Sequence, residues 1–140
     1  MHLLLVEDNP GDVRLTQEAL KEGDMNHELT VVSDGEEALK FLRKEAPYEN
    51  RPLPDLIFLD LNLPKKTGIE VLKDIKAEPD IRMIPVLILT TSEADQDIQA
   101  AYQSKANCYI TKPVDINQFI EVIQRVENFW LKVATLPSQG

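Results

Sequence analysis

The sequence predicts an α/β fold in which five parallel strands form one open, doubly wound sheet, and two observations lead to this prediction. Short apolar runs alternate with amphipathic segments along the 140 residues, and most connections between them are short. Two of the runs are apolar without a break, as expected of strands that are covered on both faces. Because parallel strands need crossover connections, this alternation predicts helices on both faces of the sheet.

The apolar runs are the predicted strands. They lie at residues 3–6, 29–32, 56–61, 86–90 and 108–110. The predicted helices are the segments whose apolar residues recur three and four positions apart. They lie at about residues 12–21, around 38–42, and at 69–77, 95–104 and 115–130.

Two of these helices begin with a capping signal. Ser33 and Glu36 have the spacing of a capping box, in which each side chain binds the backbone N–H of the other residue. Asp115 is a good N-cap for the last helix, which keeps its apolar period as far as Trp130.

Length and composition fit one globular domain. The 43% apolar content is enough for one hydrophobic core in a chain of this size. The longest connection, residues 45–55, contains three prolines and is predicted to be an exposed loop rather than a linker. We therefore expect one domain over residues 1–134 and a flexible tail at residues 135–140.

Charge and cysteine content exclude several classes of protein. The net charge of −9 argues against a nucleic-acid-binding surface, which needs clustered Lys and Arg. The single cysteine, Cys108, leaves no internal disulfide and suits a reducing compartment. The apolar run at residues 3–6 is too short for a signal peptide or a membrane span. The sequence therefore predicts a cytoplasmic protein that binds neither nucleic acid nor membrane.

Chemically active side chains follow four of the predicted strands. Glu7 and Asp8 follow the first run and Asp60 lies near the end of the third, whereas Thr90 ends the fourth and Lys112 follows the fifth. Ligands of open α/β sheets gather at the carboxyl ends of the strands, so these side chains are expected to share one rim. Taken singly, Asp8 could cap a turn, Thr90 could be an ordinary strand residue and Lys112 a surface lysine. Asp60 is harder to explain structurally, because an aspartate in an apolar run costs stability unless something binds it.

The carboxylates of this rim predict a metal site. Like charges brought together repel and raise each other's pKa unless a cation lies among them. Oxygen donors without nearby His or Cys favour a hard ion such as Mg²⁺. Its predicted ligands are Asp8, Asp60 and a backbone carbonyl near Asn62, with a water molecule held by Glu7.

The same residues suit phosphoryl transfer, which depends mainly on positioning and charge neutralisation around an in-line nucleophile. Asp60 is the candidate nucleophile and would become an aspartyl phosphate. Mg²⁺ and Lys112 would offset the charge of the phosphoryl oxygens, and the Thr90 hydroxyl could donate to one of them.

Four motifs carry a family resemblance, at residues 4–9, 59–64, 89–92 and 109–113. Together they resemble the receiver domain of two-component response regulators over about residues 2–128. The resemblance implies a flavodoxin-like three-layer sandwich. It also implies roles for five residues of the rim: Asp60 as phosphoacceptor, Glu7 and Asp8 in the metal site, Asn62 as a ligand through its backbone carbonyl, and Lys112 as a phosphate contact.

The resemblance implies further roles around the site. Thr90 and Tyr109 would form a switch pair, in which Thr90 moves toward the phosphoryl group and the ring of Tyr109 turns inward. A cis peptide bond would precede Pro113, at the small energetic cost of X–Pro bonds. The side chains of Asn62 and Ser92 would help to set the lifetime of the phosphoryl bond. Without the resemblance, Tyr109 would be a half-buried aromatic residue at the sheet edge.

A narrower resemblance lies in the segment at residues 54–66, the proline-bearing loop and the extended last helix. These features are similar to those of stand-alone regulators paired with bacterial phytochromes, which are often homodimeric. The resemblance implies a sensor histidine kinase, specifically a phytochrome, as the partner.

The end of the last helix predicts an interaction surface. Phe129, Trp130, Leu131 and Val133 lie beyond the expected end of the sheet, where an apolar cluster in water would mark a binding site. Self-association as a homodimer through Phe129 and Trp130, with the adjoining fourth helix and fifth strand, is the preferred interpretation. The alternative is that these residues fold back onto their own domain.

The sequence thus predicts a single-domain response regulator that accepts a phosphoryl group from a histidine kinase on Asp60, with Mg²⁺, and then changes its partner binding. Such a protein is not an enzyme beyond its own phosphorylation and dephosphorylation. Two alternatives remain open. One is a Mg²⁺-dependent phosphatase or hydrolase with an aspartyl nucleophile, although the sequence has no insertion large enough for a substrate cap. The other is a docking protein that works without phosphorylation.

Overall fold

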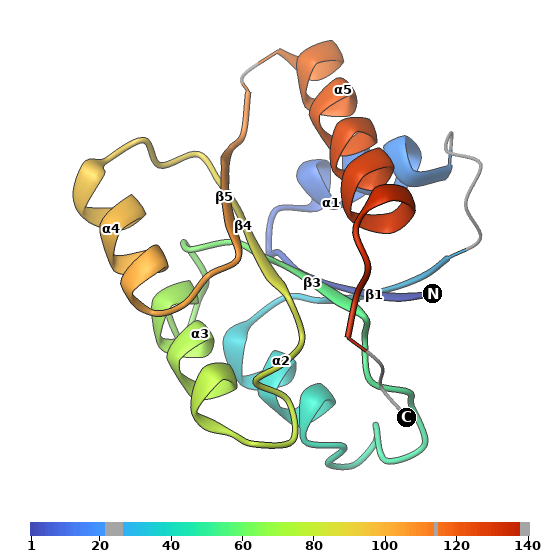
Figure 1. Cartoon of the computed structure of the whole chain (residues 1–140), viewed down its shortest axis with the longest axis vertical. Coiled ribbons are helices and arrows are strands. Elements are labelled where there is room, and N and C mark those ends of the chain that lie inside the picture. The colour runs from blue at the N-terminus through green and yellow to red at the C-terminus, as the bar shows by residue number, and fades with distance from the viewer. Residues whose placement is uncertain (22–26, 114, 138–140) are drawn as a thin grey trace.

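The computed structural model describes residues 1–21, 27–113 and 115–137, and it confirms the predicted fold. Five parallel strands form one sheet in the order β2-β1-β3-β4-β5 (Figure 1). Their bounds are β1 His2–Val6, β2 Glu28–Val32, β3 Leu56–Leu59, β4 Val86–Thr90 and β5 Cys108–Thr111. The chain winds from β1 to β2 on one side and to β3 on the other. The carboxyl ends of β1 and β3 therefore flank the switch point where open α/β sheets bind ligands.

Helices cover both faces of the sheet, which gives three layers (Figure 1). Their bounds are α1 Pro10–Lys21, α2 Gly35–Leu42, α3 Gly68–Ala77, α4 Asp95–Gln103 and α5 Ile116–Val126. Helices α1 and α5 pack together on one face, whereas α2 packs against α3, and α3 against α4, on the other.

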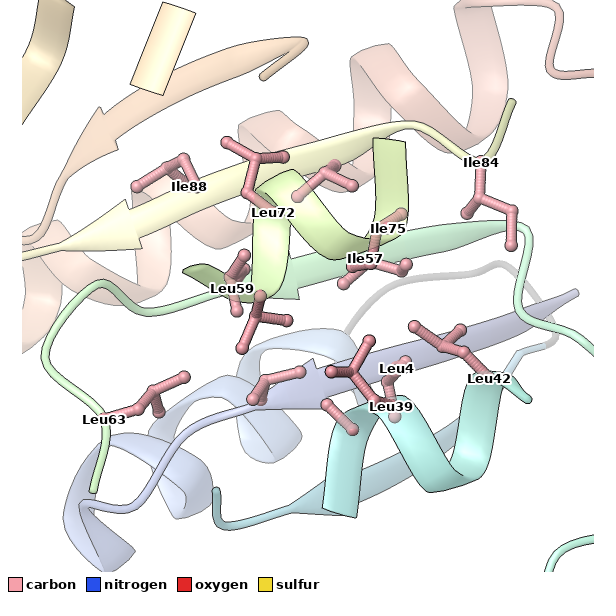
Figure 2. Close-up of a cluster of buried hydrophobic side chains, with 14 of the residues drawn as sticks. Leu4, Leu39, Leu42, Ile57, Leu59, Leu63, Leu72, Ile75, Ile84 and Ile88 are labelled. Carbon is pink, nitrogen blue, oxygen red and sulfur yellow. The ribbon is translucent and has the colours of Figure 1, made fainter. Parts of the chain in front are cut away.

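Two apolar cores hold the layers together, one on each face of the sheet. Figure 2 shows the core between the sheet and helices α2 and α3, in which Leu4 of β1 lies by Leu39 of α2, and Ile57 of β3 lies by Ile75 of α3. The next residues along the strands, Leu5 and Phe58, belong to the opposite core, under α1 and α5. Successive side chains of a strand point to opposite faces, so uninterrupted apolar strands supply both cores at once.

The predicted capping box at Ser33 and Glu36 is wrong by one residue. Asp34 is the N-cap of α2, and its Oδ1 accepts a hydrogen bond from the backbone N–H of Glu37 at 2.8 Å. Serine and aspartate are equally good caps, and each precedes a glutamate by three residues here, so the pattern alone could not decide between them. Asp115 is the N-cap of α5, as predicted, and accepts from the backbone N–H three residues on at 3.1 Å.

The cis peptide bond expected before Pro113 is not found. Within the described ranges the cis bond is Ala46–Pro47, in the connection between α2 and β3. The two isomers of an X–Pro bond differ by only about 0.5–1 kcal/mol, so the surroundings in the fold decide between them.

The proline-bearing connection between α2 and β3 is anchored to the domain. The ring of Tyr48 packs edge-on against Phe41 of α2, with centroids 5.3 Å apart. The Tyr48 hydroxyl donates to Glu37 Oε2 at 2.7 Å, and Arg51 donates to the Thr30 hydroxyl of β2 at 2.8 Å. The loop predicted to be exposed is therefore held by side-chain contacts on α2 and β2.

The last helix extends beyond Val126 as the π-helical segment η1, Glu127–Val133. Trp130 is partly buried and packs against the core beneath α1 and α5. Phe129 and Val133 are 53% and 65% exposed. The fold-back interpretation therefore holds for Trp130, whereas Phe129 and Val133 stay on the surface; the side chain of Leu131 lies outside the described residues.

The two ends of the chain differ in what they add to the fold. The apolar run near the N-terminus is β1, which is buried between β2 and β3. Residues 135–137 have no regular secondary structure, and residues 138–140 of the predicted tail lie outside the described residues. Among the helices described, none is long and apolar enough to cross a bilayer.

Candidate functional site

Acidic side chains from two neighbouring strands meet at the switch point of the sheet. Glu7 and Asp8 follow β1, and Asp60 follows β3. One carboxylate oxygen from each of the three residues lies within 4.8 Å of the others. Glu7 and Asp60 are buried, whereas Asp8 is exposed at the rim, so the cluster is closed on one side and open to solvent on the other.

Lys112 brings the positive charge into this cluster from the end of β5. Its side chain is only 3% exposed, and its ammonium donates to Glu7 Oε1 in close contact. It also donates to Asp60 Oδ2 at 3.3 Å and to Asp12 Oδ2 at 2.9 Å. Lys112 therefore joins carboxylates from the ends of β1 and β3 and from the first turn of α1.

The carboxylate of Asp60 is held in a fixed orientation. Its Oδ1 accepts from the backbone N–H of Asn62 at 3.1 Å, while Oδ2 accepts from Lys112. The backbone N–H of Asp60 donates to the carbonyl of Val6 at 3.1 Å, which continues the pairing of β3 with β1. The start of α3 lies against this segment, because a Cβ atom placed on Gly68 would lie 2.3 Å from the carbonyl oxygen of Asp60.

The charges of the cluster are strongly perturbed. Burial, together with the hydrogen bond to Asp60, raises the pKa of Glu7 to about 7. Burial also opposes ionisation of Asp60, but the hydrogen bond with Glu7 and the charge of Lys112 outweigh it and hold the pKa of Asp60 below its ordinary value. Burial would lower the pKa of Lys112, but hydrogen bonds to Glu7 and Asp12 raise it. The site therefore holds more negative charge than its one ammonium can neutralise.

This donor set fits a divalent cation that prefers oxygen. All three clustered groups are carboxylates, and neither histidine nor cysteine takes part in the cluster. Hard ions such as Mg²⁺ and Mn²⁺ bind through carboxylate, carbonyl and water oxygens. Asn62 adjoins the cluster through its backbone N–H, and the metal-ligating role of its carbonyl stays a prediction.

The two residues of the predicted switch pair lie near the site in different environments. Thr90, the last residue of β4, is fully buried, and its hydroxyl has no hydrogen-bond partner among the described residues. It lies near enough to Asp60 to contribute to the lowered pKa of that carboxyl. The Tyr109 ring is half-buried against the core, and its hydroxyl donates to the carbonyl of Ser92 at 2.9 Å. The Ser92 hydroxyl in turn donates to Asp97 Oδ2 at 2.5 Å, which links the β4–α4 connection to α4.

Sequence reasoning missed Asp12. The sequence places it only at the beginning of the first helix, yet its carboxylate reaches Lys112, 100 positions away in the chain. Its place in the first turn of a helix that starts at the site edge was a signal, because α1 begins directly after the β1 carboxylates. Local patterns do not reveal which acidic residue of a first turn faces a lysine from another strand.

Comparisons with known proteins identify the family of this chain. Residues 3–124 match the family model of the response regulator receiver domain. The chain is 48% identical to the response regulator Rcp1 of Synechocystis sp., over 97% of this chain and 92% of Rcp1. The structure matches that of the phosphorylated cyanobacterial phytochrome response regulator RcpA with a TM-score of 0.95 at 50% identity, over 98% of both chains. It matches the Mn²⁺-bound form of Rcp1 with a TM-score of 0.94 at 48% identity, over 98% of this chain and 99% of that one.

These matches cover nearly the whole chain and agree with the fold described above. They also bear out the narrower resemblance to phytochrome regulators. The chain therefore belongs to the response regulator receiver domain family and is a signalling protein related to Rcp1.

Proposed function

We propose that residues 1–134 form a cytoplasmic receiver that accepts a phosphoryl group on Asp60 from a histidine kinase, in the presence of Mg²⁺, and thereby changes the partners it binds. One observation carries the proposal. The Asp60 carboxylate is fixed at the switch point between Asn62 and Lys112, within 4.8 Å of two further carboxylates. A carboxylate in that setting is positioned for in-line attack on a phosphorus atom.

The phosphoryl transfer needs no general base. The lowered pKa of Asp60 keeps its carboxylate ionised, so an oxygen of Asp60 can attack the phosphorus of a phosphohistidine directly. An oxygen–phosphorus bond forms, the phosphorus–nitrogen bond breaks, and the departing imidazole takes up a proton from water. Dephosphorylation is the attack of water on the same phosphorus atom, which releases inorganic phosphate and restores the carboxylate.

The metal in this proposal is Mg²⁺, held by Glu7, Asp8 and Asp60, with the Asn62 carbonyl as a further ligand. When bound, the ion neutralises charge on the phosphoryl oxygens. Support comes from the oxygen-only donor set and from the related Rcp1, whose structure has been determined in a Mn²⁺-bound form. Lys112 contributes the other positive charge from the end of β5.

Thr90 and Tyr109 are proposed to convert phosphorylation into a change of surface. The buried hydroxyl of Thr90 lies close to Asp60 and can donate to a phosphoryl oxygen on it. Tyr109 would then leave the Ser92 carbonyl and turn into the space beside Thr90. Such a movement would rearrange the connection between β4 and α4, which Ser92 and Asp97 now tie together.

The kinase partner is proposed to be a phytochrome. The support is the identity of 48–50% with Rcp1 and with the phytochrome response regulator RcpA, which extends over nearly the whole chain. When the purified chain is mixed with an autophosphorylated phytochrome kinase, the phosphoryl group should move from the kinase to the chain within seconds to minutes. Transfer from an unrelated histidine kinase at the same rate would contradict this pairing.

Acetyl phosphate with Mg²⁺ tests the central proposal. Intact-mass spectrometry should show one added phosphoryl group, which Asp60→Asn abolishes and which chelation of Mg²⁺ prevents. The matched control is Asp80→Asn, at an exposed aspartate in the α3–β4 connection, which should be phosphorylated normally. Addition of a phosphoryl group to Asp60→Asn would refute the assignment of Asp60 as the phosphoacceptor. Rapid turnover of a soluble phosphoester would favour the alternative of a hydrolase. A chain that takes up no phosphoryl group but still binds the kinase would favour the alternative of a docking protein.

We also propose that the chain forms a homodimer through the surface around Phe129 and Trp130. Phe129 and Val133 are exposed apolar side chains on η1, and the Phe129 ring contacts the Trp130 ring edge-on at 5.7 Å. Sedimentation should show that Phe129→Ala shifts the protein toward monomer. Met83→Ala, which removes another exposed apolar side chain, is the control. An unchanged sedimentation coefficient in Phe129→Ala would exclude this interface.

A further inference from the structure

One acidic residue of the site has no part in the function proposed above. Asp12 lies in the first turn of α1, and its Oδ2 accepts a hydrogen bond from Lys112 Nζ at 2.9 Å. The lysine side chain is 3% exposed, whereas that of Asp12 is 26% exposed. The contact therefore joins a buried ammonium to a carboxylate that still reaches water.

The beginning of α1 fixes the position of this carboxylate. Asn9 Oδ1 accepts from the backbone N–H groups of Gly11 at 2.9 Å and of Asp12 at 3.1 Å, and so caps the helix. Pro10 is the first helical residue, a position that suits the fixed φ of proline. The Thr16 hydroxyl donates to the backbone carbonyl of Asp12 at 2.8 Å. Asp12 is thus presented to Lys112 from a well-defined backbone.

The hydrogen bonds of Lys112 are already fully used. An ammonium has three N–H donors, and Lys112 donates to three carboxylates, those of Glu7, Asp12 and Asp60. A phosphoryl group on Asp60 would add oxygens that need the same donors. One of the existing contacts must then be released.

Asp12 is the partner that Lys112 can release at least cost. Glu7 is only 3% exposed, so loss of the ammonium would leave a buried carboxylate without its cation. The contact with Asp60 lies where the phosphoryl group itself would be attached. At Asp12, water can take the place of the lysine, because that side chain is partly open to solvent.

We propose that Asp12 is a positioning residue that competes with the phosphoryl group for Lys112. This inference rests on the proposed function of Asp60. In the unphosphorylated protein Asp12 holds one N–H of Lys112 away from Asp60. When a phosphoryl group is attached, that N–H turns to a phosphoryl oxygen and water binds Asp12. The Asp12 carboxylate therefore weakens the hold of the site on a phosphoryl group.

Beryllofluoride, which binds acceptor aspartates as a phosphoryl mimic, tests this competition without turnover. It is titrated into the full chain at saturating Mg²⁺ and followed by amide chemical shifts. Asp12→Asn should bind beryllofluoride about threefold to tenfold more tightly, the scale of one net hydrogen bond. Asp12→Glu, which keeps the charge, should return toward the wild-type affinity. Glu18→Gln removes one negative charge from an exposed position of the same helix and should leave the affinity unchanged.

Three results would overturn the inference. Unchanged or weaker beryllofluoride binding by Asp12→Asn would show that Asp12 does not compete for Lys112. A large loss of Mg²⁺ affinity in a separate titration of Asp12→Asn would make Asp12 a metal-site residue instead. If the wild-type chain does not bind beryllofluoride at all, the proposed function of Asp60 fails and this inference fails with it. Failure of the proposed function can be told apart from failure of this inference alone, because it is already seen in the wild-type chain.

Discussion

Replacement of Gly68 by alanine tests how tightly the start of α3 is built around Asp60. Gly68 is the first residue of α3, and its N–H donates to the carbonyl of Leu61 at 2.9 Å. An added Cβ would lie 2.3 Å from the carbonyl oxygen of Asp60 and 2.6 Å from the Cα of Leu61. Both are backbone atoms, so no rotation of a side chain can relieve the contact.

The expected cost follows from this geometry. Cβ atoms keep at least 3.0 Å from such neighbours, so α3 and the Asp60 segment must separate by about 0.7 Å. Overpacking of this kind costs about 1–3 kcal/mol, and weakening of the Gly68–Leu61 hydrogen bond costs about 0.5–1.5 kcal/mol. Gly68→Ala should therefore lower the free energy of unfolding by about 2–4 kcal/mol, a large part of the total of about 5–15 kcal/mol.

Urea unfolding measures this loss, and Gly11→Ala is the matched control. At Gly11, in the first turn of α1, the nearest atom to an added Cβ is the side-chain Oδ1 of Asn9 at 3.2 Å. That side chain can shift slightly, and alanine is a better helix former than glycine by about 1 kcal/mol. Gly11→Ala should therefore be nearly neutral or stabilising.

The same substitution should impair function, because displacement of a nucleophile by a fraction of an ångström disrupts in-line attack. We expect phosphorylation of Gly68→Ala by acetyl phosphate to be slower by about tenfold or more. A variant whose free energy of unfolding lies within about 0.5 kcal/mol of wild type, and which is phosphorylated normally, would refute the close packing of α3 on Asp60.

The other predictions concern a helix cap, the α2–β3 loop and the cysteine. Thr67→Ala removes the capping box formed with Glu70 and should cost about 1 kcal/mol in urea unfolding, whereas Thr67→Ser should cost little; equal costs would contradict the cap. Tyr48→Phe removes the hydrogen bond to Glu37 and should cost about 0.5–1.5 kcal/mol, and a double-mutant cycle with Glu37→Gln should show coupling rather than additivity. Burial raises the pKa of the Cys108 thiol above its ordinary value, so iodoacetamide at pH 8 should alkylate the folded protein more slowly than the urea-unfolded protein. Since the folded state keeps this proton to higher pH, the free energy of unfolding should also fall as the pH rises past the ordinary thiol pKa, and less so in Cys108→Ala.

The fold could be predicted because its signals are local and repeated. The uninterrupted run that became β3, Leu56–Leu59, could be covered on both faces only in a parallel sheet between two helical layers. The residues that end each apolar run are then predicted to form the rim of the site, because parallel strands place their carboxyl ends at one edge of the sheet. The sequence therefore predicts one cluster of Glu7, Asp8 and Asp60, and the three carboxylates do lie together.

The errors arose where two local solutions are nearly equal in energy. Ser33 and Asp34 are both good caps, and only the point at which the chain leaves β2 selects Asp34. The peptide bond before Pro113 was expected to be cis, but the described cis bond precedes Pro47. The sequence left open whether Trp130 folds back onto its own domain, and the structure shows that it packs partly on its own core.

The sequence by itself determined the order of strands and helices, the two-faced burial of the central strands and the residues that end each strand. It could do so because hydrophobic periodicity and chain direction are properties of short segments. Only the tertiary structure decided that Lys112 shares its three donors among Glu7, Asp12 and Asp60. Those contacts join α1, β1, β3 and β5 across more than 50 residues of chain, and their geometry depends on how the layers pack rather than on any local pattern.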